Sequence, residues 1–207
     1  MGSREEIQAK ISASGGDAAA DWGAIERKYV QGATRSREAI LELLEERLRD
    51  YDARVFRVAN DGVRGKIEEL LRERGKRKVL IPEGFRTDWR PDGVEVSDGA
   101  GLDAAGLDLF EGVVTASTLA MAETGTICLQ GGGGEGRRAL SLVPDYHLCV
   151  VLEEDVVETV AEGVRRLDPR LATTLFSGPS ATADIEMTRI KGVHGPRFLD
   201  VIVVSAS

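Results

Sequence analysis

The sequence has few residues of the kinds that bind metals and redox cofactors. It contains only two cysteines, Cys128 and Cys149, and no Cys-x-x-Cys pair occurs in it. Because iron–sulfur clusters and thiolate zinc sites need several cysteine ligands, we expect neither of them in this chain. The two histidines, His147 and His194, are widely separated in sequence, which disfavours a histidine-rich metal site. We therefore expect no metal site and no cofactor bound by this chain.

Long hydrophobic runs and an excess of basic residues are also lacking. No segment approaches the roughly 20 consecutive apolar residues that span a bilayer, so we expect no membrane insertion. No amino-terminal apolar stretch resembles a secretory signal, and both cysteines lie in apolar runs, which favours a cytoplasmic protein. Acidic residues outnumber basic ones by 35 to 27 and the formal charge is −8, so we expect no nucleic-acid partner.

The composition that is present is that of an ordinary globular protein. Hydrophobic residues make up 42% and charged residues 30% of the 207 positions, which is enough for one compact domain. Apolar residues are sparse near the amino terminus, and we expect residues 1–35 to form a partly helical arm. We expect residues 36–207 to form a single α/β domain.

Helical and strand patterns alternate along residues 36–207. Apolar stripes predict helices that begin near residues 36 and 63. Short apolar runs predict strands at 54–58, 78–81, 94–96, 112–115, 126–130, 147–152, 173–176 and 199–204. Two further helices are predicted, one at Ser117–Glu123 and one that opens at Glu153, with a buried stripe of Val156, Val160, Val164 and Leu167. The alternation favours a mostly parallel sheet flanked by helices.

A first candidate site is the segment Ala122–Thr126. Glu123 falls near the end of a predicted helix, where the helix dipole disfavours a carboxylate by about 0.3 to 1 kcal/mol. A functional role for Glu123, as a catalytic group beside the ligand-binding residues Thr124, Gly125 and Thr126, would offset that cost. The alternative is a solvent-exposed glutamate before a glycine turn.

A second candidate is the glycine run Gly131–Gly136, which follows a predicted strand. Backbone N–H groups at Gly133 and Gly134 could bind an anion, and Arg137 and Arg138 could supply positive charge. The run matches neither the dinucleotide-binding pattern nor the Walker A pattern. The alternative is a merely flexible loop.

Two further candidates lie nearer the carboxyl terminus. Residues 176–187 leave a strand through Gly-Pro, and we expect them to enter a short helix whose amino-terminal end suits a phosphate or carboxylate. The candidate ligand-binding residues there are Ser177, Gly178, Ser180, Thr182, Asp184 and Glu186. Helix capping is the alternative role for the same side chains. His194, in a turn before the last strand, is a candidate acid or base or a structural hydrogen-bonding group, whereas His147 is expected to be structural.

Five short motifs follow one another in the carboxyl-terminal half of the chain. They are Ala-Glu-Thr-Gly-Thr (122–126), Gly-Glu-Gly-Arg-Arg (134–138), Leu-Val-Pro-Asp-Tyr-His (142–147), Ser-Gly-Pro-Ser-Ala-Thr-Ala-Asp-Ile-Glu (177–186) and Gly-Val-His-Gly-Pro (192–196). Each motif is weak alone, but together and in this order they resemble the lactate-utilisation (LUD) domain family.

The resemblance implies a fold akin to the NagB/RpiA/CoA-transferase group. It also implies an accessory or substrate-handling role in a cytosolic, iron–sulfur-dependent system that oxidises L-lactate to pyruvate, beside two partner proteins that carry the iron–sulfur clusters. Family members often have a basic residue at position 181, where this chain has Ala181. The anion contact of that side chain is then missing, and Arg137, Arg138 or Arg189 could substitute for it.

Two other functions stay open at this point. The fold group suggests an independent acyl-transfer or sugar-phosphate enzyme with Glu123 as nucleophile or base. The third possibility is a sensor that binds a carboxylate without turning it over.

Overall fold

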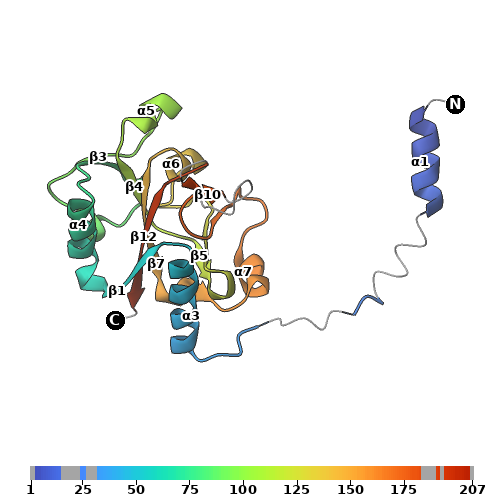
Figure 1. Cartoon of the computed structure of the whole chain (residues 1–207), viewed down its shortest axis with the longest axis horizontal. Coiled ribbons are helices and arrows are strands. Elements are labelled where there is room, and N and C mark those ends of the chain that lie inside the picture. The colour runs from blue at the N-terminus through green and yellow to red at the C-terminus, as the bar shows by residue number, and fades with distance from the viewer. Residues whose placement is uncertain (1–2, 15–23, 27–31, 183–189, 192–193, 206–207) are drawn as a thin grey trace. The chain divides into compact units, whose positions relative to one another are not determined.

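The computed structural model describes residues 3–14, 24–26, 32–182, 190–191 and 194–205 (Figure 1). The chain divides into two compact units, Met1–Val30 and Gln31–Ser207. In the described part of the first unit there is one helix, α1 (Ser3–Ser14), in which no residue is buried. The predicted division of the chain at residues 35 and 36 stays a prediction. The remaining elements belong to the second unit.

The second unit is built on a six-stranded sheet in which every neighbouring pair of strands is parallel. In spatial order its strands are β1 (Arg54–Ala59), β12 (Phe198–Ser205), β7 (Tyr146–Leu152), β4 (Gly112–Thr115), β2 (Lys78–Leu80) and β3 (Glu95–Ser97). Both β7 and β12 are almost entirely apolar because each is covered on both faces. The predicted α/β class with a mostly parallel sheet is confirmed.

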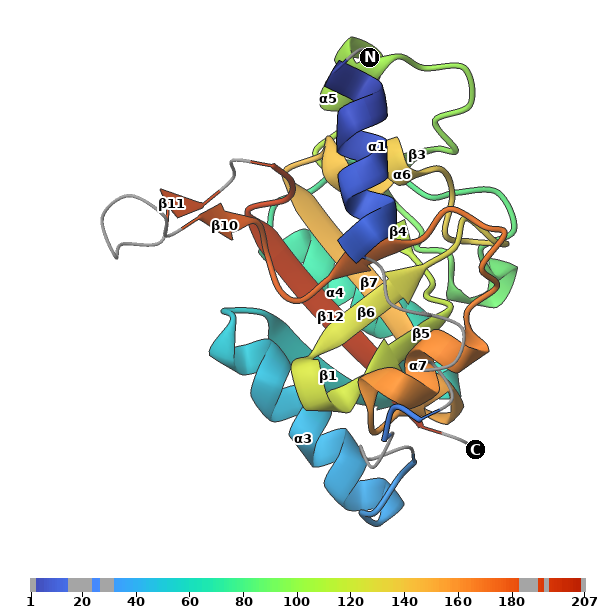
Figure 2. The same ribbon diagram turned by 90° about the vertical axis from the view of Figure 1, so that its right-hand side faces the viewer.

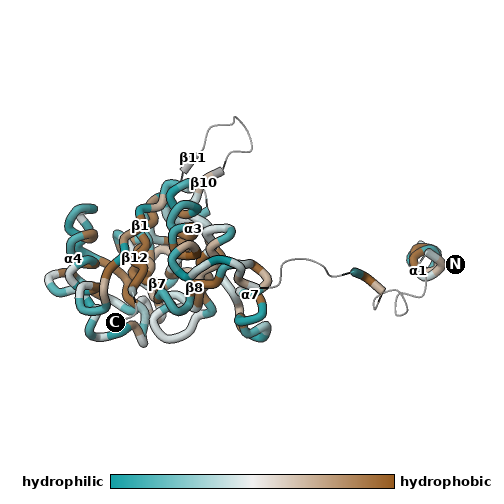
Figure 3. Tube along the Cα trace, turned by 90° about the horizontal axis from the view of Figure 1, so that it is seen from below, coloured by the Kyte–Doolittle hydropathy of each residue, from teal (hydrophilic) through white to brown (hydrophobic). Residues whose placement is uncertain are grey.

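Alternate residues of β12 enter two different hydrophobic cores. Val201 and Val203 pack on one side, whereas Ile202 and Val204 pack on the other, as the period of two in a strand requires. Helix α4 (Val63–Glu73) covers the second side, and α3 (Arg37–Asp50) covers the first together with a smaller sheet. Figure 1 shows α4 and α3 flanking the central strands, and Figure 3 shows hydrophobic colour concentrated along β12 and β7.

The helices α3 and α4 follow the apolar stripes that predict them. Ser36 caps α3 by accepting a hydrogen bond from the Ala39 N–H group, and Ile40, Leu44 and Leu48 are buried. Beyond the end of α4, Gly75 adopts a positive φ of 65°, the conformation that glycine favours after a helix. Short elements complete this part of the chain: η1 (Asn60–Gly62), η2 (Thr87–Trp89), α5 (Ala104–Asp108) and α6 (Arg138–Leu142).

The smaller sheet contains four strands and contradicts the helix predicted at Ser117–Glu123. Its order is β8 (Val156–Val157), β5 (Leu119–Met121), β6 (Thr126–Leu129) and β9 (Thr174–Phe176). The prediction was wrong because Leu119 and Met121 pack on one face of β5 while Ala120 packs on the other. A 3-10 turn, η3 (Ala122–Thr124), then reverses the chain into β6. Figure 2 shows β5 and β6 in front of the central strands.

The helix predicted from Glu153 is also different in the structure. A 3-10 turn, η4 (Glu153–Asp155), leads into β8, and α7 (Val160–Arg166) begins only after a capping box formed by Thr159 and Glu162. The predicted buried stripe was wrong, since Val160 and Val164 are exposed. Instead α7 approaches β5 through Gly163, where an added Cβ would lie 2.4 Å from a side-chain atom of Met121.

The short helix predicted within residues 176–187 does not begin at Ser180 or Thr182. Strand β10 (Ala181–Thr182) pairs antiparallel with β11 (Ile190–Lys191) instead. Asp184 and Glu186 lie outside the described residues. None of the helices in the described part of the chain has the length and apolar character needed to cross a bilayer.

Candidate functional site

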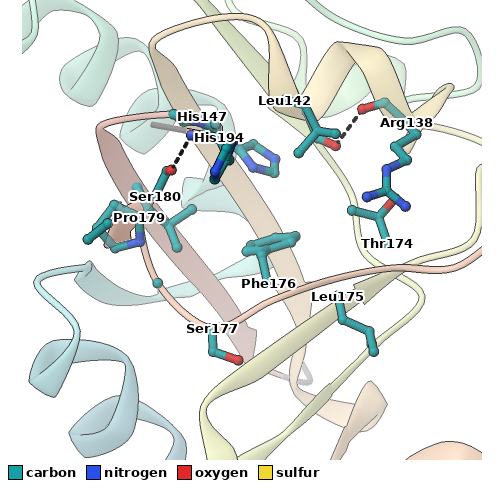
Figure 4. A pocket seen from close by; sticks show the side chains of 16 residues that line it. Arg138, Leu142, His147, Thr174, Leu175, Phe176, Ser177, Pro179, Ser180 and His194 are labelled. Atoms are coloured by element: carbon teal, nitrogen blue, oxygen red, sulfur yellow. Dashed lines mark hydrogen bonds between the residues drawn. The ribbon is translucent and has the colours of Figure 1, made fainter. Parts of the chain in front are cut away.

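A pocket of about 360 Å³ lies beside the amino-terminal ends of β7 and β12, and we call it the Arg138 pocket. Three stretches of chain form its walls: helix α6, the segment Thr174–Ala181, and the turn His194–Pro196 before β12. His147 and Leu199, each the second residue of its strand, complete the lining. Figure 4 shows these side chains converging from separate elements.

Two of the predicted clusters meet in this pocket. The backbone N–H group of Ser180 donates to the carbonyl oxygen of Pro196 at 2.8 Å, and the N–H group of His194 donates to the Ser180 hydroxyl at 3.0 Å. Gly178 adopts a φ of 100°, and a Cβ there would lie 2.5 Å from the Cβ atom of Tyr51. A glycine is therefore required for this loop to pass so close to the end of α3.

Arg138 supplies the positive charge of the pocket. It is exposed, and its guanidinium group makes no ion pair or hydrogen bond with any residue that the structure describes, although its carbonyl oxygen accepts a bond from the Ser141 hydroxyl. No carboxylate side chain is found among the described residues that line the pocket. An arginine without a nearby described carboxylate is notable in a chain of net charge −8, and it favours the binding of an anion. Hydroxyl and backbone groups of the lining would add hydrogen bonds to that anion.

His147 contributes a neutral imidazole to the pocket wall. Its side chain is only 2% exposed, its Nε2 atom lies 2.8 Å from the Thr115 hydroxyl, and its ring centroid lies 5.0 Å from that of Phe176. Burial lowers the pKa of His147 to about 3, because the apolar surroundings disfavour the charged form. At neutral pH His147 is therefore a hydrogen-bonding group and not a positive charge.

The first predicted cluster is joined to the pocket by a row of hydroxyl groups. The Thr124 and Thr126 hydroxyls lie 2.7 Å apart, and the Thr126 hydroxyl lies 2.7 Å from that of Ser177, a residue of the pocket lining. Glu123 is exposed in η3 and does not line the pocket, and its backbone N–H group donates to the carbonyl oxygen of Glu158.

Comparison with known proteins identifies the family of this chain. A model of the family described as LUD domain matches residues 107–204. A protein of Deinococcus radiodurans named lactate utilization protein C is 42% identical over 181 residues, which cover 85% of this chain and 84% of the relative. The chain belongs to the LUD domain family. A Halalkalibacterium halodurans protein of the same name is 35% identical over 99 residues, or 44% of this LUD domain protein and 43% of the relative.

A solved structure is similar to this LUD domain protein over most of its length. The crystal structure of a DUF162 family protein from Deinococcus radiodurans has a TM-score of 0.72 and 37% sequence identity. The match covers 83% of this chain and 99% of the crystallised one. Every residue that lines the Arg138 pocket lies inside the segment matched by the LUD family model.

The glycine-rich loop of the LUD domain packs against the loop that follows β2. The N–H group of Gly134 donates to the carbonyl oxygen of Glu83 at 2.8 Å, and the Gly134 carbonyl accepts from the Ala116 N–H group. A Cβ at Gly134, whose φ is 85°, would lie 2.9 Å from the Cα atom of Phe85. Close backbone approach therefore accounts for glycine at this position.

Gly133 and Arg137 line a second pocket of about 530 Å³, which does not include any residue of the Arg138 pocket. The guanidinium group of Arg137 donates a hydrogen bond to the backbone carbonyl oxygen of Leu102 and so stabilises the loop before α5. Glu83 and Asp98 also line this second pocket, which makes it less suited to an anion than the Arg138 pocket.

The structure places the predicted site residues in different parts of the molecule. Ser177, Gly178, Ser180 and His194 line the Arg138 pocket. Thr124 and Thr126 reach it through the hydroxyl row, and Gly125 forms the turn between them, whereas Glu123, Gly133, Gly134 and Arg137 do not line it. Thr182 lies in β10. Binding and catalytic roles for all these residues stay predictions.

Sequence reasoning missed Thr174 and assigned His147 only a structural role. His147 stands within the motif Leu-Val-Pro-Asp-Tyr-His, which is a usable signal, but its orientation depends on the pairing of β7 with β4. Arg138 was considered as a positive charge beside the glycine run and as a substitute for a basic residue at position 181, but not as part of the pocket that it lines in the structure. Among the described residues, no group of three or more histidine, cysteine and acidic side chains is placed to hold a metal ion.

Proposed function

We propose that this LUD domain protein is an accessory or substrate-handling component of a cytoplasmic system that oxidises L-lactate to pyruvate. The relative that is 42% identical over most of both chains bears the name lactate utilization protein C, which supports a role in lactate utilisation. The Arg138 pocket carries the proposal, since its guanidinium group pairs with no described residue and no described carboxylate lies in its lining.

The ligand proposed for this pocket is a small carboxylate. A guanidinium group binds a carboxylate through two parallel N–H···O bonds, and hydroxyl groups such as those of Ser177 and Ser180 add neutral donors. A pocket of about 360 Å³ falls in the ordinary range for small-molecule sites. Lactate and pyruvate each carry one carboxylate and one further oxygen, so both offer the charge and the hydrogen-bonding groups that this lining can bind.

The electrons of lactate are proposed to pass through two partner proteins that carry iron–sulfur clusters. Cys128 and Cys149 are both buried, and burial raises the pKa of each thiol to about 12, which opposes formation of the thiolate that ligates iron. We therefore propose that this chain binds the organic acid and that its partners carry out the electron transfer.

A binding titration tests the ligand part of this proposal. We expect L-lactate to bind the full chain in isothermal titration calorimetry at pH 7, and Arg138→Ala to weaken binding by about 10- to 100-fold, the effect of losing about 1.5 to 3 kcal/mol. Arg170→Ala is the matched control, because Arg170 is 87% exposed and pairs with Asp168 outside the pocket. Equal binding by all three proteins would contradict a role for the Arg138 pocket.

A genetic and biochemical test addresses the system. The chain should co-purify with two cysteine-rich iron–sulfur proteins from its own organism, and its deletion should abolish growth on lactate. Normal growth on lactate after deletion would reject the proposal. Turnover of an acyl-CoA or sugar phosphate that is lost in Glu123→Gln would instead favour an independent enzyme, and saturable carboxylate binding without any effect on growth would favour a sensor.

A further inference from the structure

His147 lines the Arg138 pocket, and one of its two ring nitrogens has no hydrogen-bond partner among the residues that the structure describes. The residue is 2% exposed, and only its Nε2 atom has a hydrogen-bond partner among the residues that the structure describes. The Nδ1 atom is not among the fully buried side-chain atoms that lack a partner in the described chain, so it has some accessible surface. Since His147 lines the pocket, its Nδ1 atom is the group left to meet a ligand.

The protonation of that nitrogen follows from the chain of bonds behind it. The Thr115 hydroxyl lies 2.8 Å from His147 Nε2 and donates to the Cys149 sulfur at 3.6 Å, and the Cys149 thiol in turn donates to the Ala116 carbonyl oxygen at 3.7 Å. A hydroxyl group has a single proton to donate. If Thr115 gives that proton to Cys149, it can only accept from His147, so Nε2 carries the ring proton and Nδ1 carries a lone pair.

We infer that His147 presents an unprotonated Nδ1 atom to the pocket and thereby selects a 2-hydroxy acid over the corresponding 2-oxo acid. The hydroxyl group of a 2-hydroxy acid would donate to Nδ1 while Arg138 binds the carboxylate. A 2-oxo acid has only lone pairs to offer at that position, so the two acceptors would face each other unpaired. The inference rests on the proposed binding of a carboxylate in this pocket.

The surroundings of His147 keep this arrangement in place. Its ring is held between Thr115 and Phe176, whose centroid lies 5.0 Å away, so the ring cannot turn freely. Burial lowers the pKa of His147 to about 3, so Nδ1 stays an acceptor throughout the neutral range. Sites that bind a substrate hydroxyl discriminate strongly against analogues that lack it, because their own polar group is then left unsatisfied.

Nitrogen-15 NMR of the ligand-free protein tests the tautomer directly. The chain has only two histidines, so a His194→Asn variant assigns the resonances of His147. We expect a protonated Nε2 and an unprotonated Nδ1 at pH 7. A protonated Nδ1 would overturn the inference whether or not any acid binds.

Binding of L-lactate and pyruvate tests the selectivity. We expect the unaltered chain to bind L-lactate at least about tenfold more tightly than pyruvate. In Cys149→Ala the Thr115 hydroxyl loses its sulfur acceptor and is free to donate to Nε2, so the ratio of the two affinities should fall at least about fivefold. Cys149→Ser is the matched control, because a serine hydroxyl still accepts from Thr115 and should preserve the ratio within about twofold.

The outcomes separate this inference from the proposed function. Equal affinities for the two acids, or an unchanged ratio in Cys149→Ala, would overturn the role of His147 and leave a carboxylate pocket standing. If the unaltered chain binds neither acid, the proposed carboxylate pocket is rejected, and the inferred selectivity is rejected as well.

Discussion

The hydroxyl group of Tyr146 donates a 2.9 Å hydrogen bond to the carboxylate of Asp200, at the amino-terminal ends of the neighbouring strands β7 and β12. Arg54 and Arg74 donate to the same carboxylate, whose side chain has no exposed surface. Burial opposes ionisation of Asp200, but the hydrogen bonds from Arg54, Arg74 and Tyr146 outweigh it and lower the pKa of the carboxyl group. This cluster holds the first residues of β12, directly after the turn that lines the pocket.

We predict that Asp200→Asn lowers the free energy of unfolding by about 2 to 4 kcal/mol, because two arginines lose their shared counter-charge. Tyr146→Phe removes one hydrogen bond and should cost about 1 kcal/mol. The control is Asp145→Asn, which breaks a pair with Arg197 in which the side chains are 35% and 56% exposed, and it should change stability by less than about 1 kcal/mol. Urea denaturation at pH 7 measures all three, and a greater loss in Asp145→Asn than in Asp200→Asn would contradict the prediction.

The central sheet could be predicted from the sequence, whereas the smaller sheet could not. The near-continuous apolar runs of β7 and β12 identify strands that are buried on both faces. The segment 117–123 fits either a helix or a strand, and only its pairing with β6 decides between them. In the same way, Val156 enters a strand because β5 lies beside it.

The candidate site was predictable as a set of loops but not as a pocket. The motifs containing Ser180 and His194 were identified, yet their contact depends on a hydrogen bond between segments 14 residues apart. The sequence does not reveal that the His147 ring points toward Thr115, since this requires the register in which His147 pairs with Val113. Side-chain direction at a site is thus set by strand pairing, which short motifs do not encode.

Protonation of His147 should destabilise the protein in mild acid. Its pKa is about 3 in the folded chain and about 6.5 when unfolded, so between these values the unfolded chain binds more protons. The contribution of His147 to the free energy of unfolding should therefore be fully present above about pH 6.5. It should fall by a few kcal/mol as the pH drops toward 3. His147→Gln keeps a donor for Thr115 but cannot titrate, so urea midpoints measured from pH 7 to 4 should fall less steeply for this variant. His194→Gln, the same substitution at the other histidine, is the matched control.

The carboxylate of Glu158 should contribute stability in a lower pH range. It accepts hydrogen bonds from the N–H groups of Arg35 and Thr34 and is 3% exposed. These bonds lower the pKa of Glu158 from 4.5 to about 2, so its contribution is present above about pH 4.5 and is lost as the pH falls toward 2. Glu158→Gln should be less stable than the unaltered chain at pH 7, and the difference should shrink at pH 3. Glu154→Gln, the same substitution at an exposed neighbour, is the matched control in the same denaturation series.

Gly125 tests whether the motif Glu-Thr-Gly-Thr is conformationally required. Its φ is 60°, and an added Cβ would lie 2.8 Å from the Cβ atom of Arg47 and 3.1 Å from that residue's carbonyl carbon. Gly125→Ala should therefore lower the free energy of unfolding by at least about 1 to 2 kcal/mol, from backbone strain and displacement of α3. Gly65→Ala is the same substitution in α4, where nothing lies within 4 Å of the new Cβ, and it should raise stability by about 0.5 to 1 kcal/mol. Thermal and urea unfolding of the pair measure both effects. If Gly125→Ala has the same free energy of unfolding as the unaltered chain, α3 must move to accommodate the new methyl group. Ligand binding would then be the remaining explanation for glycine in this turn.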